Sequence, residues 1–223
     1  MSTGDRLARK DKTKAAHVSR PLGVAVAGSL AVAALAPGVP AHAEGVPATT
    51  TGISVGPNGL PVPQGAEAPS VSTDGRYVAF QSFATTLVPG DTNRSMDVFV
   101  HDRQTGRTER VSVDTYGREA TDIVAQSSIS ADGRYVSFIT ASPNLSLRPD
   151  TNHASDVFVR DRSTGITDRV SVMADGSESP KTSLIARISA DGRHVAFESD
   201  SNLVPETPTT KPTCTFATWK PAH

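Results

Sequence analysis

Two loops of the sequence carry oxygen-bearing side chains at a spacing that suits a cation. In each loop an Asp, an Asn and a second Asp stand at positions one, three and seven. Calcium binds about six to eight oxygen ligands, and calcium loops supply many of them from alternate positions. The side chains are Asp91, Asn93 and Asp97 in one loop and Asp150, Asn152 and Asp156 in the other. Their spacing makes calcium binding a hypothesis for both loops.

The same six residues also have a purely structural explanation. Neither loop has the glycine at position six or the glutamate at position twelve of a complete calcium loop. Asp and Asn side chains accept hydrogen bonds from nearby backbone N–H groups and so form turns. Asp97 and Asp156 each stand where a strand is expected to begin. Both explanations stay open at this point, and the sequence assigns no catalytic residue, no cofactor and no metal ligand.

The remaining candidates for chemistry are better explained as structure. Three Asp-Gly pairs, each followed by Arg, are interpreted as turns. Three histidines stand at unrelated places in the repeat described below and are interpreted as surface or strand residues. No Gly-x-Ser-x-Gly, Gly-rich phosphate loop or His-Glu-x-x-His motif occurs. The residues are Asp74, Arg76, Asp132, Arg134, Asp191 and Arg193 in the turns, the histidines His101, His153 and His194, and Cys214, which is not expected to be a nucleophile. A hydrolase built on two carboxylates remains an alternative, although no carboxylate pair stands apart from the repeat.

The Asp-Gly pairs lie in a segment that occurs three times. The copies are residues 71–80, 129–138 and 188–197, and the central copy reads ISADGRYVSF. Their aspartates are 58 and 59 residues apart. Asp-Gly favours the positive φ angles that a two-residue turn between antiparallel strands requires, so each copy predicts a hairpin with such a turn. Sequence similarity at a fixed period indicates a fold built from repeated structural units.

Each unit predicts four short strands. In the central unit, strand one ends at Ser130 and strands two to four cover 135–140, 156–160 and 167–172. Apolar residues alternate along these strands on both faces, so both faces of the sheet must be covered. Four-stranded units stacked face to face around an axis achieve this, which is the β-propeller arrangement. A two-sheet sandwich would not need near-identical repeats, and a β-solenoid would use shorter coils.

The repeat resembles that of the TolB-like propellers, which are relatives of the WD-repeat propellers. The pattern is Ser-x-Asp-Gly-Arg-x-Val-x-Phe followed by an Asp-Val-Phe-Val strand. It is found at 72–80 with 97–100 and at 130–138 with 156–159, while 189–197 matches the first half alone. The resemblance implies an all-β fold of four-stranded antiparallel blades over residues 53–205. It is informative for fold and weak for function, because such propellers serve as binding platforms and as gating domains of peptidases.

The number of blades departs from the family pattern. Relatives close with about six to eight blades, whereas this chain contains two units and half of a third. Each Asp-Gly turn follows an apolar-Ser-Val triplet by 19 residues, and these triplets are 53–55, 111–113 and 170–172. The first triplet therefore matches the last strand of a unit whose beginning is absent before it. We expect an incomplete ring of about two and a half blades, with open edges and bare end faces that favour self-association.

The N-terminal segment has the pattern of a secretory signal peptide. Residues 1–20 carry six basic and two acidic side chains, residues 22–36 are mostly small and apolar, and Ala41-His42-Ala43 is a small-x-small cleavage site. We expect a signal peptide over 1–43, a linker over 44–52 and a secreted product. The apolar run is shorter than the ~20 residues of a membrane-spanning helix, so no stable membrane span is expected after cleavage; an uncleaved anchor is the alternative.

The segment 206–223 departs abruptly from the repeat. It holds the only cysteine and the only tryptophan of the chain. With one base restored before the codon of Glu206, freely chosen codons read Gly-Asp-Thr-Asn and then an Asp-Val-Tyr-Val strand. We therefore expect a non-family tail that arose by a shifted reading frame, which would truncate a longer propeller and remove the third strand of the last unit. A natural tail is the alternative.

The composition limits the partners. After residue 43 the chain has 16 basic and 21 acidic residues, a net charge of −5, which does not favour nucleic acid. We expect an exported, non-catalytic binding module for a protein, peptide or glycan. One alternative is the non-catalytic propeller of an exported serine peptidase whose hydrolase domain is missing, and another is a fragment without function.

Overall fold

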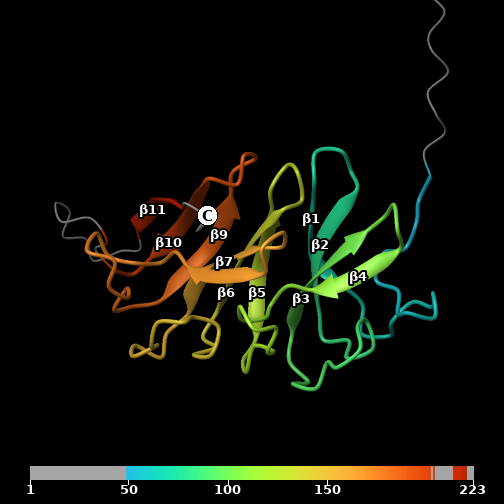
Figure 1. Ribbon diagram of the computed structural model, residues 1–223, viewed down its shortest axis with the longest axis horizontal. Coiled ribbons are helices and arrows are strands. Elements are labelled where there is room, and N and C mark those ends of the chain that lie inside the picture. Colours follow the sequence, from blue (N-terminus) through green and yellow to red (C-terminus); the bar gives the residue numbers. More distant parts are fainter. Residues whose placement is uncertain (1–48, 202, 204–212, 220–223) are drawn as a thin grey trace, which may run out of the picture. The chain divides into compact units, whose positions relative to one another are not determined.

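The computed structural model describes residues 49–201, 203 and 213–219. The expected signal peptide 1–43, its apolar run and residues 44–48 of the expected linker lie outside the described residues. Within those residues the chain forms antiparallel β-sheets (Figure 1). No helix among them is long and apolar enough to cross a membrane.

Three sheets follow one another along the chain, and each is formed by consecutive strands. The first sheet contains β1 (Glu67–Val71), β2 (Tyr77–Ser82), β3 (Asp97–Asp102) and β4 (Arg107–Arg110); the second contains β5 (Val124–Ile129), β6 (Tyr135–Thr140), β7 (Asp156–Asp161) and β8 (Ile166–Arg169); the third contains β9 (Ser183–Ile188), β10 (His194–Ser199) and β11 (Thr213–Thr218).

The sheets pack face to face through apolar side chains, as both-sided alternation predicts. Val98 and Val100 of the first sheet form one buried cluster with Val136 and Phe138 of the second. Val157 and Val159 of the second sheet form another with Val195 and Phe197 of the third. This arrangement confirms the prediction of an all-β fold made of propeller-type blades in an incomplete ring.

The hairpin between β5 and β6 differs from the predicted two-residue turn, and its two counterparts do likewise. Residues 130–134 connect the strands, and only Gly133 of the Asp-Gly pair has a positive φ, of 73°. Asp132 acts through its side chain, whose Oδ1 accepts the hydroxyl of Ser130 at 2.6 Å and the N–H of Arg134 at 2.9 Å. The prediction of a turn was right, but Asp132 does not have the predicted positive φ. Hydrogen bonds to its carboxylate close the turn instead.

The predicted fourth strand, 167–172, is also corrected. β8 covers Ile166–Arg169, and the chain then turns into a small hairpin in which Val172 pairs with Glu178. The same hairpin occurs at Val113 with Glu119 and at Val55 with Pro61. Each contains one of the recurring glycines at its tip, with φ of 74° at Gly59, 81° at Gly117 and 79° at Gly176. The triplet 53–55 is thus an equivalent of the other two, although as a hairpin arm rather than a full strand.

The third sheet has a third strand, although the sequence analysis predicted that this strand is missing. β11 lies in the segment 206–223 and pairs with β10 over six residue pairs, from His194 with Thr218 to Ser199 with Thr213. This is the register in which β3 pairs with β2 and β7 with β6. Alternating Thr, Cys, Phe and Ala suit a strand, and backbone hydrogen bonds to an open edge need no family side chains.

The expected bare face of the first sheet is covered around Phe80 and Phe99, whereas Val71 of β1 on the same face is 58% exposed. Phe80 and Phe99 are buried, and they form a cluster with Val62, Ala84 and Leu87. The hairpin that begins at the triplet 53–55 and the loop after β2 supply this cover. The first sheet is therefore only partly bare on this face.

Candidate functional site

The Asn side chain of each proposed calcium loop stabilises the loop through hydrogen bonds. The side-chain oxygen of Asn93 accepts the N–H of Ser95 at 2.8 Å, and the amide nitrogen donates to Asp97 at 2.8 Å and to the carbonyl of Ala120 at 3.0 Å. The residue after it, Arg94, has a φ of 54°. The second loop repeats the turn, because the oxygen of Asn152 accepts the N–H of Ala154. An Asn oxygen that already accepts a backbone N–H is a poor metal ligand.

The two strand-leading aspartates, Asp97 and Asp156, are buried and bound by serines of the recurring triplets. The hydroxyl of Ser112 donates to Asp97 at 2.5 Å and accepts the N–H of Val98 at 3.1 Å. In the second sheet the hydroxyl of Ser171 donates to Asp156 at 2.6 Å and accepts the N–H of Val157 at 3.0 Å. The serine replaces a strand carbonyl at this point, which explains its recurrence in the sequence.

Sequence reasoning missed the cation that stands among the carboxylates. Arg110, at the end of β4, has Nη1 2.6 Å from Glu119, 3.5 Å from Asp91 and 3.9 Å from Asp97. Its Nη2 donates to the carbonyl of Gly90 at 3.2 Å. We call Arg110 with these three carboxylates the first arginine cluster. The signal was present in the sequence, since an Arg and a Glu recur at the same places in both units.

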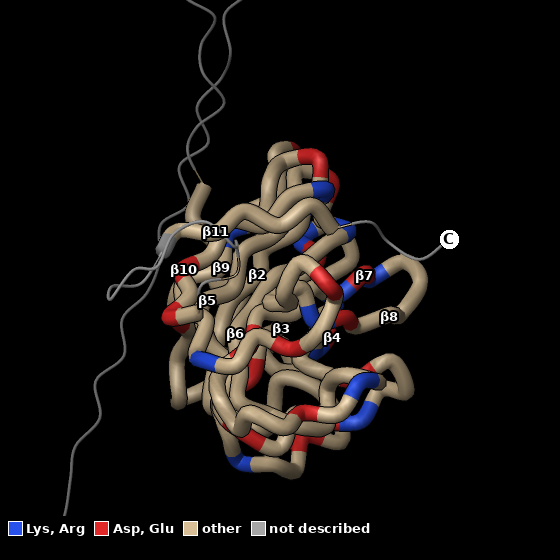
Figure 2. Tube along the Cα trace, turned by 90° about the vertical axis from the view of Figure 1, so that its left-hand side faces the viewer, with Lys and Arg blue, Asp and Glu red and all other residues tan. Residues whose placement is uncertain are grey.

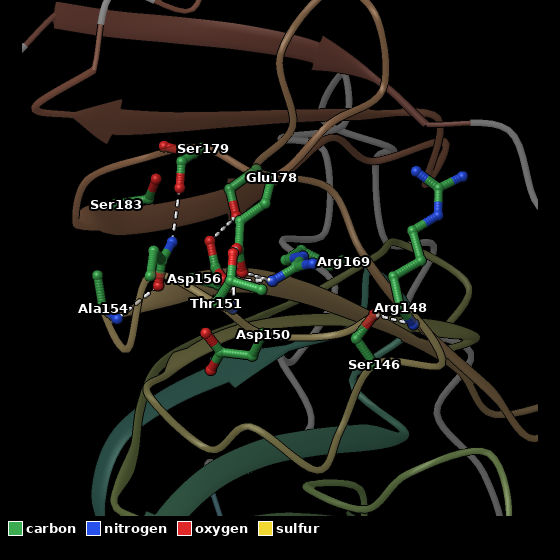
Figure 3. A network of polar contacts seen from close by, with 12 residues as sticks. Ser146, Arg148, Asp150, Thr151, Ala154, Asp156, Arg169, Glu178, Ser179 and Ser183 are labelled. Carbon is green, nitrogen blue, oxygen red and sulfur yellow. Dashed lines mark hydrogen bonds and ion pairs between the residues drawn. The ribbon is translucent and has the colours of Figure 1, made fainter.

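The second arginine cluster is the equivalent arrangement one unit later, in which the arginine pairs with two of the three carboxylates (Figure 3). It consists of Arg169, Asp150, Asp156 and Glu178. Arg169 Nη1 lies 2.9 Å from Asp156 and contacts Glu178, and Nη2 donates to the carbonyl of Pro149 at 3.0 Å. Carboxylate oxygens of Asp150, Asp156 and Glu178 all lie within 4.8 Å of one another. Figure 3 shows the arginine approaching Asp156 and Glu178.

Threonines tie the glutamates of the clusters to the loops. Thr92 donates to Glu119 from its N–H at 2.7 Å and from its hydroxyl at 2.6 Å. Thr151 makes the corresponding bonds to Glu178 at 2.9 and 2.6 Å. Each cluster thus joins the loop before a third strand to the small hairpin that leads to the next sheet.

Burial and local charge set the proton affinities in the first cluster. Burial, and next the charge of Asp97, raise the pKa of Asp91 to about 6. Burial also raises the pKa of Asp97, against the bonds from Ser112 and Asn93. For Glu119, burial opposes ionisation, but the Thr92 bonds and the charge of Arg110 outweigh it and lower the pKa. Two of the three carboxylates therefore hold their protons more tightly than free aspartate does.

This chemistry favours an internal ion cluster over a calcium site. A guanidinium supplies a fixed positive charge and several donors at the point where a cation would sit. The geometry brings Asp91, Asn93 and Asp97 together, and it does the same for Asp150, Asn152 and Asp156. Most of these oxygens accept from Arg, Ser, Thr or backbone donors; one exception among the described residues is Asp91 Oδ1, which is buried without a hydrogen-bond partner. The carboxylates of Asp150, Asp156 and Glu178 lie close enough together to hold a metal ion, and Arg169 contacts two of them.

The other predicted residues are dispersed. Asp74 and Asp132 form the turns, and the arginines of the same turns pair with the opposite strand: Arg76 with Asp102 at 2.8 Å and Arg134 with Asp161 at 2.7 Å. Asp191 forms the third turn, but Thr218 replaces the acidic partner of Arg193.

The histidines do not meet, as the sequence predicts. His101 is buried in β3 with Nδ1 2.9 Å from the hydroxyl of Thr108, His153 is exposed in a loop, and His194 stacks on Phe216. Cys214 lies exposed on β11. Basic and acidic positions are interspersed on the side of the trace shown in Figure 2.

No family model and no curated protein matches the chain. Solved structures are similar in fold. TolB from Acinetobacter baumannii is 20% identical with a TM-score of 0.40, over 64% of this chain and 29% of that one. A putative TolB from Agrobacterium tumefaciens is 16% identical with a TM-score of 0.41, over 65% and 42%. The β-propeller domain of the trilobed protease from Pyrococcus furiosus is 14% identical with a TM-score of 0.37, over 60% and 34%.

The chain thus spans less than half the length of the TolB chains to which it is similar. At these identities and TM-scores the likeness adds nothing on function. The blade architecture rests on the sheets themselves.

Proposed function

We propose that the chain is a non-catalytic binding module that holds an extended segment of a protein partner along the outer edge of its first sheet. The observation that supports this is a groove of about 620 Å³ beside β4. The groove is lined by Val55, Gly56, Pro57, Leu87, Val88, Pro89, the strand Arg107–Arg110 with Gly106 before it, Val113, Gly117 and Arg160. Ligand sites commonly have volumes of about 300–1,000 Å³.

The second sheet shows how such an edge is occupied. Thr167 of β8 donates its N–H to the hydroxyl of Thr115 at 3.2 Å, and that hydroxyl approaches the Thr167 carbonyl at 3.4 Å. The hydroxyl of Thr167 donates to the carbonyl of Val113 at 2.6 Å. The chain's own segment 113–115 therefore covers the backbone of this edge residue.

The first sheet lacks this cover. Thr108 pairs with His101 as Thr167 pairs with Arg160, so the two threonines are equivalent. Pro57 stands where the second unit has Thr115 and has no hydroxyl to offer. Among the described residues, no group bonds the outward N–H and carbonyl of Thr108. A free edge of this kind accepts an extended peptide as an added strand.

The walls of the groove indicate what the segment carries. Val55, Val88 and Pro89 supply apolar surface on one side. Arg107 is exposed, and no described residue pairs with its side chain. A segment with apolar residues and one acidic side chain fits this lining. The non-catalytic part of the proposal is supported by the two arginine clusters, in which most carboxylate oxygens are engaged by internal donors.

The test gives the first sheet the hydroxyl that covers the same edge residue in the second sheet. Pro57→Thr restores the hydroxyl found at Thr115, which satisfies Thr108 internally. A phage-displayed library of random dodecapeptides is panned on the wild-type chain, and the enriched peptides are titrated by calorimetry. We expect at least ten-fold weaker binding to Pro57→Thr and unchanged binding to the control Pro63→Thr, an exposed proline outside the groove. Equal binding to both variants, or no enriched peptide, would refute the proposal.

We also propose that the module works outside the cytoplasm. The basic segment, apolar run and Ala41-His42-Ala43 site of residues 1–43 support this. N-terminal sequencing of protein recovered from the culture medium or periplasm should begin at Glu44. Recovery of uncleaved protein from the cytoplasm alone would contradict export.

A further inference from the structure

The chain makes the same sheet-to-sheet interface twice. In the first interface Ile129 of β5 packs in one cluster with Val100 of β3, and they are 7% and 1% exposed. In the second, Ile188 of β9 packs in one cluster with Val159 of β7. Each sheet thus contributes its third strand to the interface with the first strand of the next.

The hairpin turns link the sheets in a ladder. The N–H of Thr73 donates to the carbonyl of Ala131 at 2.9 Å, and the N–H of Ala131 donates to Ala190 at 2.9 Å. The ring of Tyr77 covers Gly133 and that of Tyr135 covers Gly192, so closely that a Cβ at either glycine would collide with it. One aromatic ring and one backbone bond therefore join each turn to the next.

A polar contact also joins the first sheet to the second, between β2 and β5. When the side-chain amide of Gln81 on β2 is oriented so that its oxygen faces β5, that oxygen accepts the N–H groups of Gln126 and Ser127, at 2.7 and 3.0 Å. These bonds fasten a bulge of the second sheet to the first. By strand register Glu198 of β10 is the equivalent of Gln81.

The two outer faces of the described structure are the two unmatched halves of this interface. On the first sheet Val71, the equivalent of Ile129, is 58% exposed. On the third sheet Phe216, the equivalent of Val100, is 65% exposed. Inside the chain, Ile129 and Val100 are buried and Ile188 is partly buried, because a neighbouring sheet covers each of them.

The hairpin turns of the first and third sheets each lack, on one side, the neighbouring turn that the inner turns contact. Gly75, the equivalent of Gly133, has only an Arg103 nitrogen within 4 Å of an added Cβ. His194 stands at the place of Tyr77 with no further turn beneath it among the described residues, and its Nδ1 is buried without a hydrogen-bond partner. The N–H of Ala190 likewise has no acceptor among the described residues.

The serines of the recurring triplets indicate a third pair of groups that would meet in this interface. The hydroxyls of Ser112 and Ser171 accept the N–H of Val98 and of Val157. Ser54 is their equivalent, and no described residue provides it with such an N–H. Cys214 is the equivalent of Val98 in the register of β11. Residues 49–52, which precede this triplet as β4 precedes its own, are exposed and unpaired.

We propose that two copies of the chain join end to end, with the third sheet of each copy packed on the first sheet of the other. The occupant is a second copy because the chain carries both halves of an interface that it already forms twice. Residues 49–55 of each copy then lie along β11 of the partner. Three sheets from each copy give six, which falls within the 4–8 blades with which propellers close. Head-to-tail contacts that close after two copies give a two-fold symmetric dimer.

The test is the mass in solution, by sedimentation equilibrium of the purified chain. The wild type is expected at twice the mass of one chain. Val71→Lys and Phe216→Lys each place a charge in the interface and should halve the mass. Leu147→Lys, at a residue that is exposed in the loop after β6, should leave it unchanged. Far-UV circular dichroism and thermal melting show whether each variant is folded.

A charge-pair rescue separates this interface from general stickiness. In the double variant Val71→Asp/Phe216→Lys the opposite charges meet across both contacts, so the dimer should return at low salt and dissociate at high salt. A monomeric wild type, a larger or open-ended assembly, or a dimer that ignores both single substitutions would overturn the proposal. These outcomes are independent of peptide binding beside β4.

Discussion

At the scale of single residues, the main feature of each acidic loop is the arginine that lies against its carboxylates. Arg110 lies near three carboxylates and Arg169 contacts two, and their side chains are 9% and 2% exposed. A buried ion cluster contributes little net stability compared with apolar packing, but loss of its one cation leaves charges without a partner. The clusters are therefore expected to tolerate replacement of the whole set better than removal of the arginine.

Arg169→Met tests this directly. The substitution keeps much of the side-chain volume and removes the charge, so Asp156 and Glu178 lose their cation. We expect a loss of about 3 kcal/mol in the free energy of unfolding by urea. Arg103→Met, an exposed arginine, is the control and should change stability by less than about 0.5 kcal/mol. A similar small loss in both variants would show that the second arginine cluster is not an ion lock.

Asp91 predicts a pH dependence with a definite sign. Its pKa is raised from 3.8 to about 6 in the folded chain, so the folded state binds its proton more tightly than the unfolded state. The stabilisation is present at low pH and is lost as pH rises through about 6. The wild type should therefore lose more stability between pH 5 and pH 7 than Asp91→Asn does, by an amount on the order of 1 kcal/mol. Parallel stability curves for the two proteins over this range would contradict the assignment.

At the scale of elements, the turns do as much as the strands to fix the stacking of sheets. Each Ser-x-Asp-Gly-Arg turn closes its own hairpin through the Asp carboxylate. In the second and third turns, Gly133 and Gly192 also lie against a tyrosine ring of the sheet before. The glycine is thus needed twice, for its positive φ and for its lack of a side chain. A single pattern in the sequence therefore encodes both a hairpin and a sheet-to-sheet contact.

Gly133→Ala separates these two roles. Its Cβ would lie 2.7 Å from Cγ of Tyr77, whereas Gly117, with a similar positive φ, has nothing within 4 Å of an added Cβ. Gly117→Ala should cost about 1–2 kcal/mol from backbone strain alone. Gly133→Ala should cost at least 2 kcal/mol more in chemical denaturation. Adding Tyr77→Ala to Gly133→Ala should recover part of that difference, and strictly additive losses would argue against the contact.

At the scale of the whole described structure, the three sheets are not equally well built. The first and second sheets have stacked phenylalanine pairs, Phe80 with Phe99 and Phe138 with Phe158. In the third sheet Phe197 faces Thr215, whose hydroxyl is buried without a partner. Trp219 takes over part of the missing packing, through an edge contact with Tyr135 at 5.0 Å.

The third sheet should therefore open first. Amide exchange followed by mass spectrometry is expected to be faster in β10 and β11 than in β6 and β7. Thr215→Val removes the unsatisfied hydroxyl at nearly constant volume, so it should stabilise the chain by about 1 kcal/mol and slow exchange in β11. Exchange that is slowest in the third sheet, or a destabilised Thr215→Val variant, would contradict this order of stability.

Local signals determined the repeated hairpins and the apolar alternation of the strands, and hence the stacked four-stranded units. These features follow from φ preferences and from a period of two, which depend only on neighbouring residues. The sequence did not show what faces the carboxylates of the Asp-Asn-Asp loops. Arg110 and Arg169 are more than ten residues away from them along the chain, and only the tertiary structure brings them close. The third strand of the last sheet was missed for a related reason. Backbone hydrogen bonds at an open edge accept any segment that can extend beside it, so only the tertiary structure could place β11 there.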